Sequence, residues 1–304
     1  MTHENWSLPT LKAQPTIGTE WIVEPIIAPD STSIIFGPRE AGKTQFVLSL
    51  FRAIQESALC LGHFRCRRVR AALVEIDMPK GLLQTRLQAM PYAFDNELFL
   101  AQTFRYAPNI MTCAQQTPWI ADLNAFAPEW IVFDSLRKLH HMKDEAPEAP
   151  SQVYNKLREL FPNAARTVLH HVRKPPPSYM LNGSHYTQAD DPEAYRGTTA
   201  WLDDADAAVY MPYNFKTGER AVWLTRSRLV ADDRKGAPIA VRIDEDSLFL
   251  EAANPSPQIR LLVWKSEHLH ASLPEACAYL KEIAPGKARA TYYRWASAAG
   301  FEGK

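Results

Sequence analysis

The chain has 304 residues, of which 46% are hydrophobic, and its 34 Lys and Arg balance its 34 Asp and Glu. This length fits one α/β domain with a small appendage, and the apolar content is enough for a sizeable core. The formal net charge of zero excludes a globally basic protein, so any surface for nucleic acid has to be local.

Membrane and secretion signals are missing from the sequence. No apolar run approaches the roughly 18 residues of a membrane span, and the first ten residues have neither a basic nor an apolar signal region. Four cysteines are too few for a disulfide framework. Cys60, His63 and Cys66 lack a fourth ligand at a zinc-site spacing, and we interpret this stretch as a connecting loop. We therefore expect a cytoplasmic protein without membrane contact.

The predicted elements begin after a lead-in over residues 1–30. Apolar runs predict strands at 32–36, 70–77, 98–105, 129–134, 166–171, 206–212, 221–226 and 239–243. Helical periodicity predicts helices at 44–57, 80–90, 116–126 and 150–161. This alternation predicts an α/β domain over residues 31–253, with a mostly parallel sheet, helices on both of its faces and antiparallel strands at its end.

A linker and a helical module are expected over residues 254–304. The Pro/Ser-rich stretch from Ala253 to Gln258 is typical of a linker. Ser272 is the predicted N-cap of a helix, with Glu275 three residues later, and Gly286 marks a turn before a second helix. The pattern predicts a helix-turn-helix or winged-helix module. Binding of DNA and docking of a partner protein both stay open for it, because aromatic residues at helical spacing are often core.

The stretch FGPREAGKT, from Phe36 to Thr44, has the spacing G-x-x-x-x-G-K-[ST] between a predicted strand and a predicted helix. In this context backbone N–H groups converge on a phosphate at the positive end of a helix dipole. Lys43 is expected to reach the β- and γ-phosphates of ATP, and Thr44 to ligate Mg²⁺. Glu40 stands where many such loops carry a further glycine. The predicted nucleotide-binding residues are Gly37, Pro38, Arg39, Glu40, Ala41, Gly42, Lys43, Thr44 and Gln45.

Carboxylates end two further predicted strands. Asp134 follows the apolar run Trp130–Phe133 and is expected to hold Mg²⁺ through water, because ligand sites of parallel sheets lie at the carboxyl ends of strands. Glu75 and Asp77 alternate at the end of an earlier strand, which would place both on one face. One acid beside the γ-phosphate could polarise an attacking water, so hydrolysis is favoured over phosphoryl transfer.

The motifs resemble a known family when they are taken together. Residues 31–245 carry, in this order, the phosphate loop, DMP, WIVFDSLRKLH, VLHHVRK, YRGTTAWLDDADAAVY and WLTRSR. This series resembles RecA-like ATPases of the plasmid RepA type, which are related to DnaB-type hexameric helicases. The resemblance implies ATP hydrolysis and assembly into a ring or filament, with a hexamer expected. It also implies a replicative or accessory helicase of a mobile element, acting on single-stranded DNA.

The resemblance assigns roles to single residues. Asp77 matches the catalytic carboxylate, with Glu75 as the alternative, and His171 matches the residue that senses the γ-phosphate. Arg226 and Arg228 match the basic fingers that a subunit presents to the ATP of its neighbour. Since alternate residues of a strand point the same way, both guanidinium groups could reach one phosphate.

The activity itself stays open between alternatives. The family places a DNA-contacting loop at residues 174–195, but the interior of this stretch has Asp190, Asp191 and Glu193 and no Lys or Arg, which is poor for a phosphate track. The protein could instead be a DNA-associated assembly switch, such as a loader, recombination mediator or defence adaptor, without unwinding activity. A small-molecule kinase is a third alternative, which the arginine pair and the tail disfavour.

Overall fold

The structure of the protein is a computed structural model. It describes residues 7–14, 20–143, 146–171, 200–213, 218–230, 238–253, 257, 260–261, 264 and 272–298. The expected DNA-contacting stretch 174–195 and most of the expected linker lie outside the described residues. Within the described ranges, no helix combines the length and the apolar character that crossing a membrane requires.

The strands of the main sheet are formed by the apolar runs of the sequence. Their bounds are β2 (Thr32–Gly37), β5 (Ala71–Glu75), β6 (Phe99–Thr103), β7 (Trp130–Asp134), β8 (Ala165–His171), β9 (Ala207–Tyr210), β10 (Arg220–Ser227), β11 (Ile239–Ile243) and β12 (Leu250–Ala252). Their order across the sheet is β12-β11-β10-β9-β2-β8-β7-β5-β6. From β9 to β6 the strands are parallel, whereas β10, β11 and β12 continue the sheet antiparallel. The predicted α/β class with a mostly parallel sheet is therefore confirmed.

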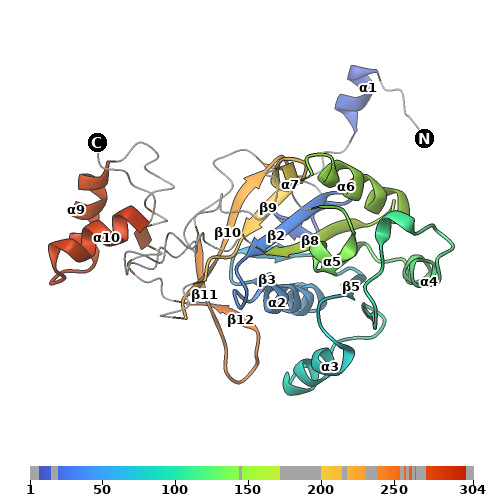
Figure 1. Cartoon of the computed structure of the whole chain (residues 1–304), viewed down its shortest axis with the longest axis horizontal. Helices are drawn as coiled ribbons and strands as arrows, with labels where there is room; N and C mark the ends of the chain where they lie inside the picture. Colours follow the sequence, from blue (N-terminus) through green and yellow to red (C-terminus); the bar gives the residue numbers. More distant parts are fainter. Residues whose placement is uncertain are drawn as a thin grey trace.

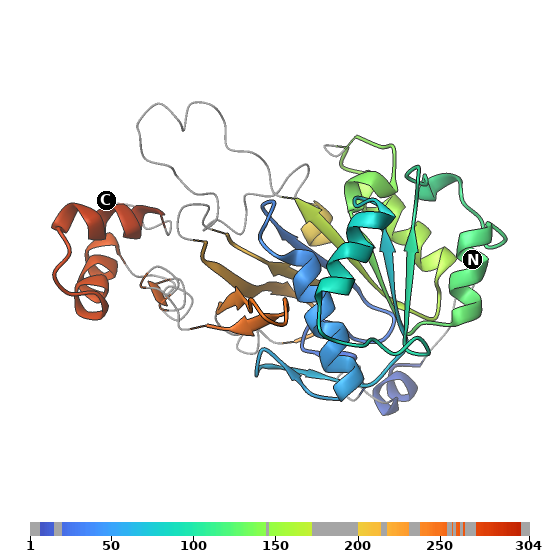
Figure 2. The ribbon, with the colours of Figure 1, turned by 90° about the horizontal axis from the view of Figure 1, so that it is seen from below.

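Helices cover both faces of this sheet (Figure 1 and Figure 2). Their bounds are α2 (Lys43–Glu56), α3 (Lys80–Ala89), α4 (Pro118–Phe126), α5 (Leu136–Leu139), α6 (Ala149–Leu160) and α7 (Ala200–Asp203). In β2, Ile35 packs with α2, whereas Ile34 and Phe36 pack in the buried cluster that contains α6. Because successive side chains of a strand point to opposite faces, the end of β2 is held between two cores.

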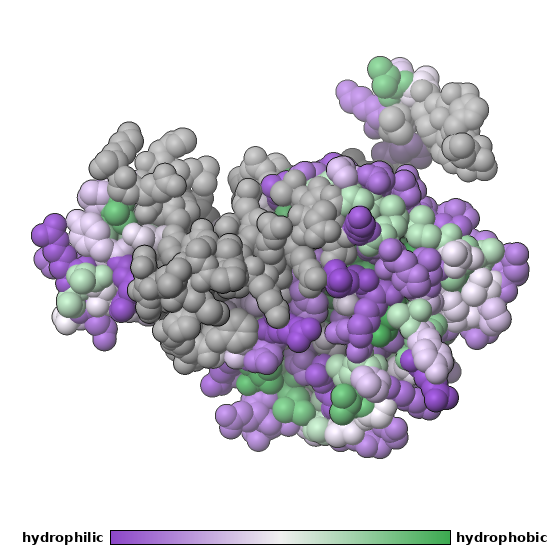
Figure 3. Space-filling view, in the orientation of Figure 1, coloured by the Kyte–Doolittle hydropathy of each residue, from purple (hydrophilic) through white to green (hydrophobic). Residues whose placement is uncertain are grey.

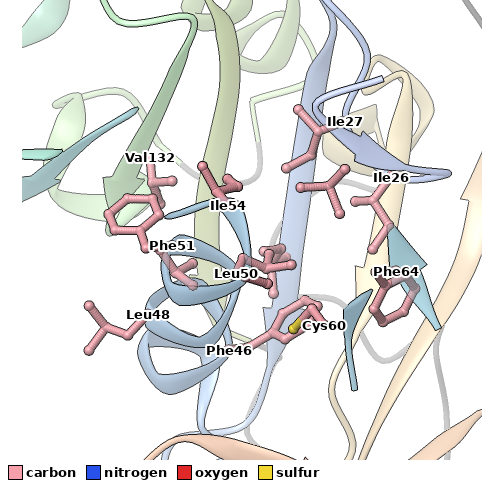
Figure 4. Packing of buried hydrophobic residues seen from close by; sticks show 14 of the residues in the cluster. Ile26, Ile27, Phe46, Leu48, Leu50, Phe51, Ile54, Cys60, Phe64 and Val132 are labelled. Atoms are coloured by element: carbon pink, nitrogen blue, oxygen red, sulfur yellow. The ribbon is translucent and has the colours of Figure 1, made fainter. Parts of the chain in front are cut away.

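Helix α2 anchors the residues that follow the phosphate loop (Figure 4). Phe46, Leu50 and Ile54, spaced by four residues, are fully buried. Phe51 packs edge-on against Trp130 of β7, with the ring centroids 5.3 Å apart. Full burial of one such side chain contributes about 1.5–3 kcal/mol. The start of α2 beside the loop is therefore determined by packing further along the helix.

A second, small sheet is not predicted from the sequence. It consists of β1 (Val23–Glu24), β4 (Phe64–Cys66) and β3 (Leu59–Cys60), in the order β1-β4-β3. The stretch from Cys60 to Cys66 is thus a hairpin and not a simple connecting loop. Burial raises the pKa of both cysteine thiols, that of Cys66 to about 12. Buried thiols that stay protonated are inert and are poor metal ligands.

Part of the expected lead-in belongs to the main core. A short helix, α1 (Leu8–Ala13), comes first in the described chain. Ile22, Ile26 and Ile27 are buried in the same cluster as α2, and Figure 4 shows Ile26 and Ile27 directed toward that core. Residues of the lead-in therefore contribute to the stability of the phosphate-loop region.

Two helices, α9 (Leu273–Ile283) and α10 (Arg289–Ala298), form the C-terminal part. The predicted capping box is present, since the backbone N–H of Ser272 donates to Glu275 over 2.7 Å. Gly286 has φ +83°, the left-handed conformation that its turn requires. The helices share a buried cluster of their own that includes Leu280 and Tyr292. The two C-terminal helices expected from the sequence are therefore present.

Candidate active site

The phosphate loop lies between the end of β2 and the start of α2. A Cβ atom on Gly37 would lie 2.3 Å from the carbonyl oxygen of Met211, so that no other residue fits without movement of the backbone. Gly42 has φ +90° and is the N-cap of α2, where it supplies no capping side chain to the first helical N–H groups. Glu40 adopts φ +65°, the conformation of the glycine that it replaces. The backbone N–H groups at the start of α2 are therefore available to bind a phosphate.

Lys43 is nearly buried, with 7% of its surface exposed. Its Nζ donates to the carbonyl oxygens of Gly37 at 3.0 Å and Pro38 at 2.8 Å, and lies 3.3 Å from Nδ1 of His171. Burial lowers the pKa of Lys43 to about 8, in spite of the opposing effect of Asp134. The ammonium group is thus held over its own loop in a place where an anionic phosphate would strongly favour its charged form.

Thr44 and Asp134 form a hydroxyl–carboxylate pair. The Oγ1 of Thr44 donates to Oδ2 of Asp134 over 2.7 Å. Asp134 is the last residue of β7, and burial raises the pKa of its carboxyl while the hydrogen bond from Thr44 opposes this shift. Hydroxyl and carboxylate oxygens are ligands that Mg²⁺ prefers. The pair therefore fits the predicted magnesium site, either directly or through water.

Glu75 and Asp77 do not share one face of a strand. β5 ends at Glu75, and the predicted alternation stops there because the chain turns. Glu75 Oε1 accepts hydrogen bonds from the backbone N–H groups of Asp77 at 2.9 Å and Met78 at 2.7 Å, and Oε2 has no hydrogen-bond partner among the residues that the structure describes. Burial, reinforced by nearby Asp134, raises the pKa of Glu75 to about 8. Glu75 is therefore a buried carboxyl group that supports the backbone of Asp77.

Asp77 is the more exposed of the two acids. Its Oδ1 lies 2.7 Å from Nζ of Lys138, with 43% of the Asp77 side chain and 47% of the Lys138 side chain exposed. Lys138 belongs to α5, and its Nζ also donates to the backbone carbonyl of Asp77 over 3.3 Å. Lys138 thus fixes the short carboxylate side chain beside the cavity.

The two histidines at the end of β8 have different surroundings. His171 lies next to Lys43, at the level of Gly37 in the neighbouring strand. His170 is 1% exposed and stacks on Trp201, with ring centroids 6.5 Å apart. Because the side chains alternate, only His171 faces the phosphate loop.

A cavity of 610 Å³ brings most of the predicted residues together. Its lining consists of Arg39, Glu40, Gly42, Lys43, Thr44, Gln45, Glu75, Asp77, Met78, Arg86, Asp134, His171, Arg220 and Ile243. Arg86 and Arg220 are not singled out by the sequence. Arg220 donates from Nε to the carbonyl of Glu40 over 3.2 Å, and its guanidinium lies 4.4 Å from the ring centroid of Tyr213. No motif marks Arg220, although its position at the start of an apolar strand is visible in the sequence.

Arg226 and Arg228 do not line this cavity. β10 runs antiparallel to β9, and Ser227 pairs with Ala207, so this end of β10 lies at the opposite edge of the sheet from the phosphate loop. Arg226 donates to the carboxylate of Asp203, and Arg228 donates to the carbonyl oxygen of the same residue. A register shift between Leu224 and Arg226 interrupts the simple alternation. Both guanidinium groups nevertheless reach one residue.

A comparison with family models agrees with the phosphate-loop chemistry. A family model described as an AAA domain matches residues 4–177, more than half of the 304-residue chain. Among solved structures, the chain is similar to the crystal structure of flagellar accessory protein FlaH from Methanocaldococcus jannaschii, with 12% identity, a TM-score of 0.48 and coverage of 76% of this chain and 92% of that one. No curated protein matches the chain. The chain therefore belongs to the AAA domain family, and its phosphate loop is that of a P-loop ATPase that binds ATP and Mg²⁺.

Proposed function

We propose that the protein hydrolyses ATP as an assembly of RecA-like subunits and acts on DNA as a RepA-type replicative or accessory helicase of a mobile element. The observation that carries the hydrolytic part is the convergence of Lys43, the Thr44–Asp134 pair and two further carboxyl groups on one cavity. The assembly part is supported by Arg226 and Arg228, which lie away from the cavity of their own chain.

The residues of the cavity would each have a separate role in ATP hydrolysis. Mg²⁺, when bound, would neutralise charge on the phosphates, and Thr44 and Asp134 would hold it. Lys43 would pair with the β- and γ-phosphates and His171 would respond to the γ-phosphate through its position beside Lys43. Asp77 would orient the attacking water and accept its proton, because burial raises the pKa of Glu75 and one of the Glu75 oxygens is committed to the backbone.

The division between the two acids can be tested by charge-neutral substitutions. Asp77→Asn should reduce ATP turnover by at least about a hundredfold, on the scale of removing a proton acceptor, while nucleotide binding persists. Glu75→Gln should keep more activity, since an amide oxygen can still accept from the N–H groups of Asp77 and Met78. Single-turnover hydrolysis and binding of a fluorescent nucleotide would measure both. Equal, near-normal rates in the two variants would remove this segment from the mechanism.

Assembly would move the arginine pair from Asp203 to the neighbour's nucleotide. In the single chain Asp203 accepts hydrogen bonds from both guanidinium groups. A phosphate with more negative charge would compete with the Asp203 carboxylate for Arg226 and with the Asp203 carbonyl oxygen for Arg228. An arginine supplied across an interface can raise the rate by about 10³ or more. The expected assembly is a ring or filament, with a hexamer as the leading candidate, that encloses single-stranded DNA.

The decisive experiment mixes two inactive subunits. Lys43→Ala disables its own cavity, whereas Arg228→Ala disables the cavity of the neighbour. Mixing them should restore part of the ATPase activity, because wild-type Lys43 and wild-type Arg228 then meet at some interfaces. Activity per subunit should also rise with protein concentration, with size followed by light scattering. A monomer whose specific activity does not depend on concentration, and that shows no rescue on mixing, would contradict the proposed assembly.

An ATP-dependent switch on DNA, without unwinding, is the second candidate. It is favoured by the acidic interior of residues 174–195, which is unsuited to tracking a phosphate backbone. Strand displacement measured beside ATPase activity, each with and without single-stranded DNA, separates the two candidates. A helicase separates the strands in an ATP-dependent way, whereas a switch shows ATPase activity and assembly with no displacement.

A further inference from the structure

The charged side chains of α10 and of the turn before it are all basic. Lys287, in the turn before the helix, Arg289 and Arg294 are all exposed. No Asp or Glu occurs between Gly286 and Ala298. Hydrophilic and hydrophobic residues both appear on the side of this helix pair that Figure 3 shows.

The aromatic residues of α10 serve mainly as core. Tyr292 is 6% exposed and Ala296 is fully buried, at the four-residue spacing of one helix face. Trp295 is half-buried and packs against the same cluster. These rings therefore contribute to the core of the helix pair, and the exposed charged groups are Lys287, Arg289 and Arg294.

The turn that presents this face is fixed by a single hydroxyl group. The Tyr292 OH donates to the carbonyl of Ala284 over 2.8 Å and accepts from the N–H of Lys287 over 3.1 Å. Both ends of the turn are thereby tied to the second helix. Arg289 is also restrained, because its Nη2 lies 3.3 Å from the OH of Tyr293 and its guanidinium lies 5.4 Å from that ring centroid. The basic groups thus belong to an ordered surface.

The acidic residues of the described module, Glu275 and Glu282, both belong to α9. Glu275 is engaged in the capping box at the start of α9. Glu282 is exposed near the end of that helix, beside the likewise exposed Lys281. The charge of the described module is therefore asymmetric, with the second helix of the pair as its positive side.

We propose that α10 is a docking surface for double-stranded DNA, with Lys287, Arg289 and Arg294 contacting phosphates. A helix of this kind, the second of a tight helix pair, has the dimensions to enter the major groove of B-DNA. The exposed basic side chains complement the phosphate backbone, which supplies most of the affinity of such contacts. The inference rests on the proposed action on DNA and adds the surface and the form of DNA that it recognises.

The test uses the full chain and a fluorescent duplex of about 20 base pairs, long enough for a helix-turn-helix contact. Anisotropy titrations over a range of salt concentrations give the affinity and its salt dependence. The variant is Arg289→Glu with Arg294→Glu, and the matched control is Arg65→Glu with Arg105→Glu, which reverses the same number of exposed charges elsewhere. Circular dichroism checks that each variant keeps its helices.

Loss of two phosphate contacts should weaken duplex binding at least about tenfold. The salt slope, which is the slope of the logarithm of the binding constant against the logarithm of the salt concentration, should fall by about two in magnitude. The control variant should bind like the wild type. Arg289→Lys should retain the salt slope. The inference is overturned if the wild-type chain fails to bind duplex, or if variant and control bind equally. In either case, ATPase stimulation by single-stranded DNA and the subunit-mixing experiment still report on the proposed function separately. An acidic partner protein as the occupant would appear as unchanged duplex binding in the charge-reversal variant.

Discussion

Lys43 and Glu75 face the same cavity, and burial favours the uncharged form of each. The pKa of Lys43 falls to about 8, and the pKa of Glu75 rises to about 8. Bound phosphates would favour the ammonium form of Lys43, and a bound cation would favour the carboxylate form of Glu75. The binding of nucleotide is thus coupled to protonation at the cavity.

This coupling predicts a pH dependence of the ligand-free protein. Glu75 has its ordinary pKa of 4.5 when unfolded and about 8 when folded, so its contribution to stability is present below pH 4.5 and is lost as pH rises to 8. Lys43 has a lowered pKa, so stability returns as pH rises from 8 to 10.5. We expect the free energy of unfolding, followed by urea titration with EDTA present, to be lowest near pH 8.

Two substitutions isolate the groups responsible. Glu75→Gln should remove the fall in the free energy of unfolding between pH 4.5 and pH 8. Lys43→Met should remove the rise in the free energy of unfolding between pH 8 and pH 10.5. Since other groups titrate as well, the difference between variant and wild type at each pH is the quantity to compare. Parallel curves for wild type and both variants would show that these two side chains keep ordinary pKa values in the folded state.

Gly37 offers a steric prediction at the same site. An added Cβ would meet a backbone oxygen at 2.3 Å, which cannot be relieved by rotation of a side chain. Gly37→Ala should therefore destabilise the protein by about 1–3 kcal/mol, the usual cost of overpacking. Gly81→Ala is the matched control, because no atom lies within 4 Å of its added Cβ and the residue is helical. The control should be neutral or stabilise by about 0.5–1 kcal/mol in the same urea titration.

At the level of elements, long apolar runs made the main sheet predictable. β2, β7 and β8 are buried on both faces, and the middle of each contains β-branched or aromatic residues that favour such strands. The hairpin of β3 and β4 has only two and three residues, too few for a periodic signal. β5 ends before Asp77 because Glu75 binds the following backbone N–H groups, a contact that alternation alone does not reveal.

Some residues of the candidate site could likewise be predicted from the sequence, and others could not. The phosphate loop is contiguous, and Asp134 and His171 end predicted strands, so sequence spacing was sufficient to find them. Lys138 and Arg220 reach the site only because β7, β10 and the phosphate loop come together in the folded chain. Their roles depend on contacts with Asp77 and with the carbonyl of Glu40, which carry no local sequence signal.

The C-terminal helix pair supplies a prediction at the scale of an element. Tyr292→Phe keeps the buried ring but removes both hydrogen bonds of the hydroxyl to the turn. The N–H of Lys287 and the carbonyl of Ala284 would lose this partner, at a cost of about 1–2 kcal/mol. Hydrogen exchange should therefore increase in α9 and α10 and stay unchanged in the main sheet. Tyr293→Phe, which leaves these two bonds intact, is the control.

At the scale of the whole molecule, we expect bound nucleotide to stabilise the folded state, because the chain belongs to the AAA domain family. A non-hydrolysable ATP analogue with Mg²⁺ at about 100 times its dissociation constant should add about 2.7 kcal/mol to the free energy of unfolding. Lys43→Ala should show a much smaller gain at the same concentrations. Thermal unfolding with and without the analogue measures this difference, and an equal gain in the two proteins would contradict the role of Lys43.

β10 connects the cavity with the edge of the sheet that carries the arginine pair. It begins at Arg220, beside the carbonyl of Glu40 in the phosphate loop, and Arg226 lies near its other end. Because β9 and β11 pair with it on either side, β10 cannot slide without the loss of register along the sheet. In the proposed assembly, a change at one nucleotide therefore reaches the next one as a rotation of the whole subunit, and the pitch of the ring or filament would follow the nucleotide state.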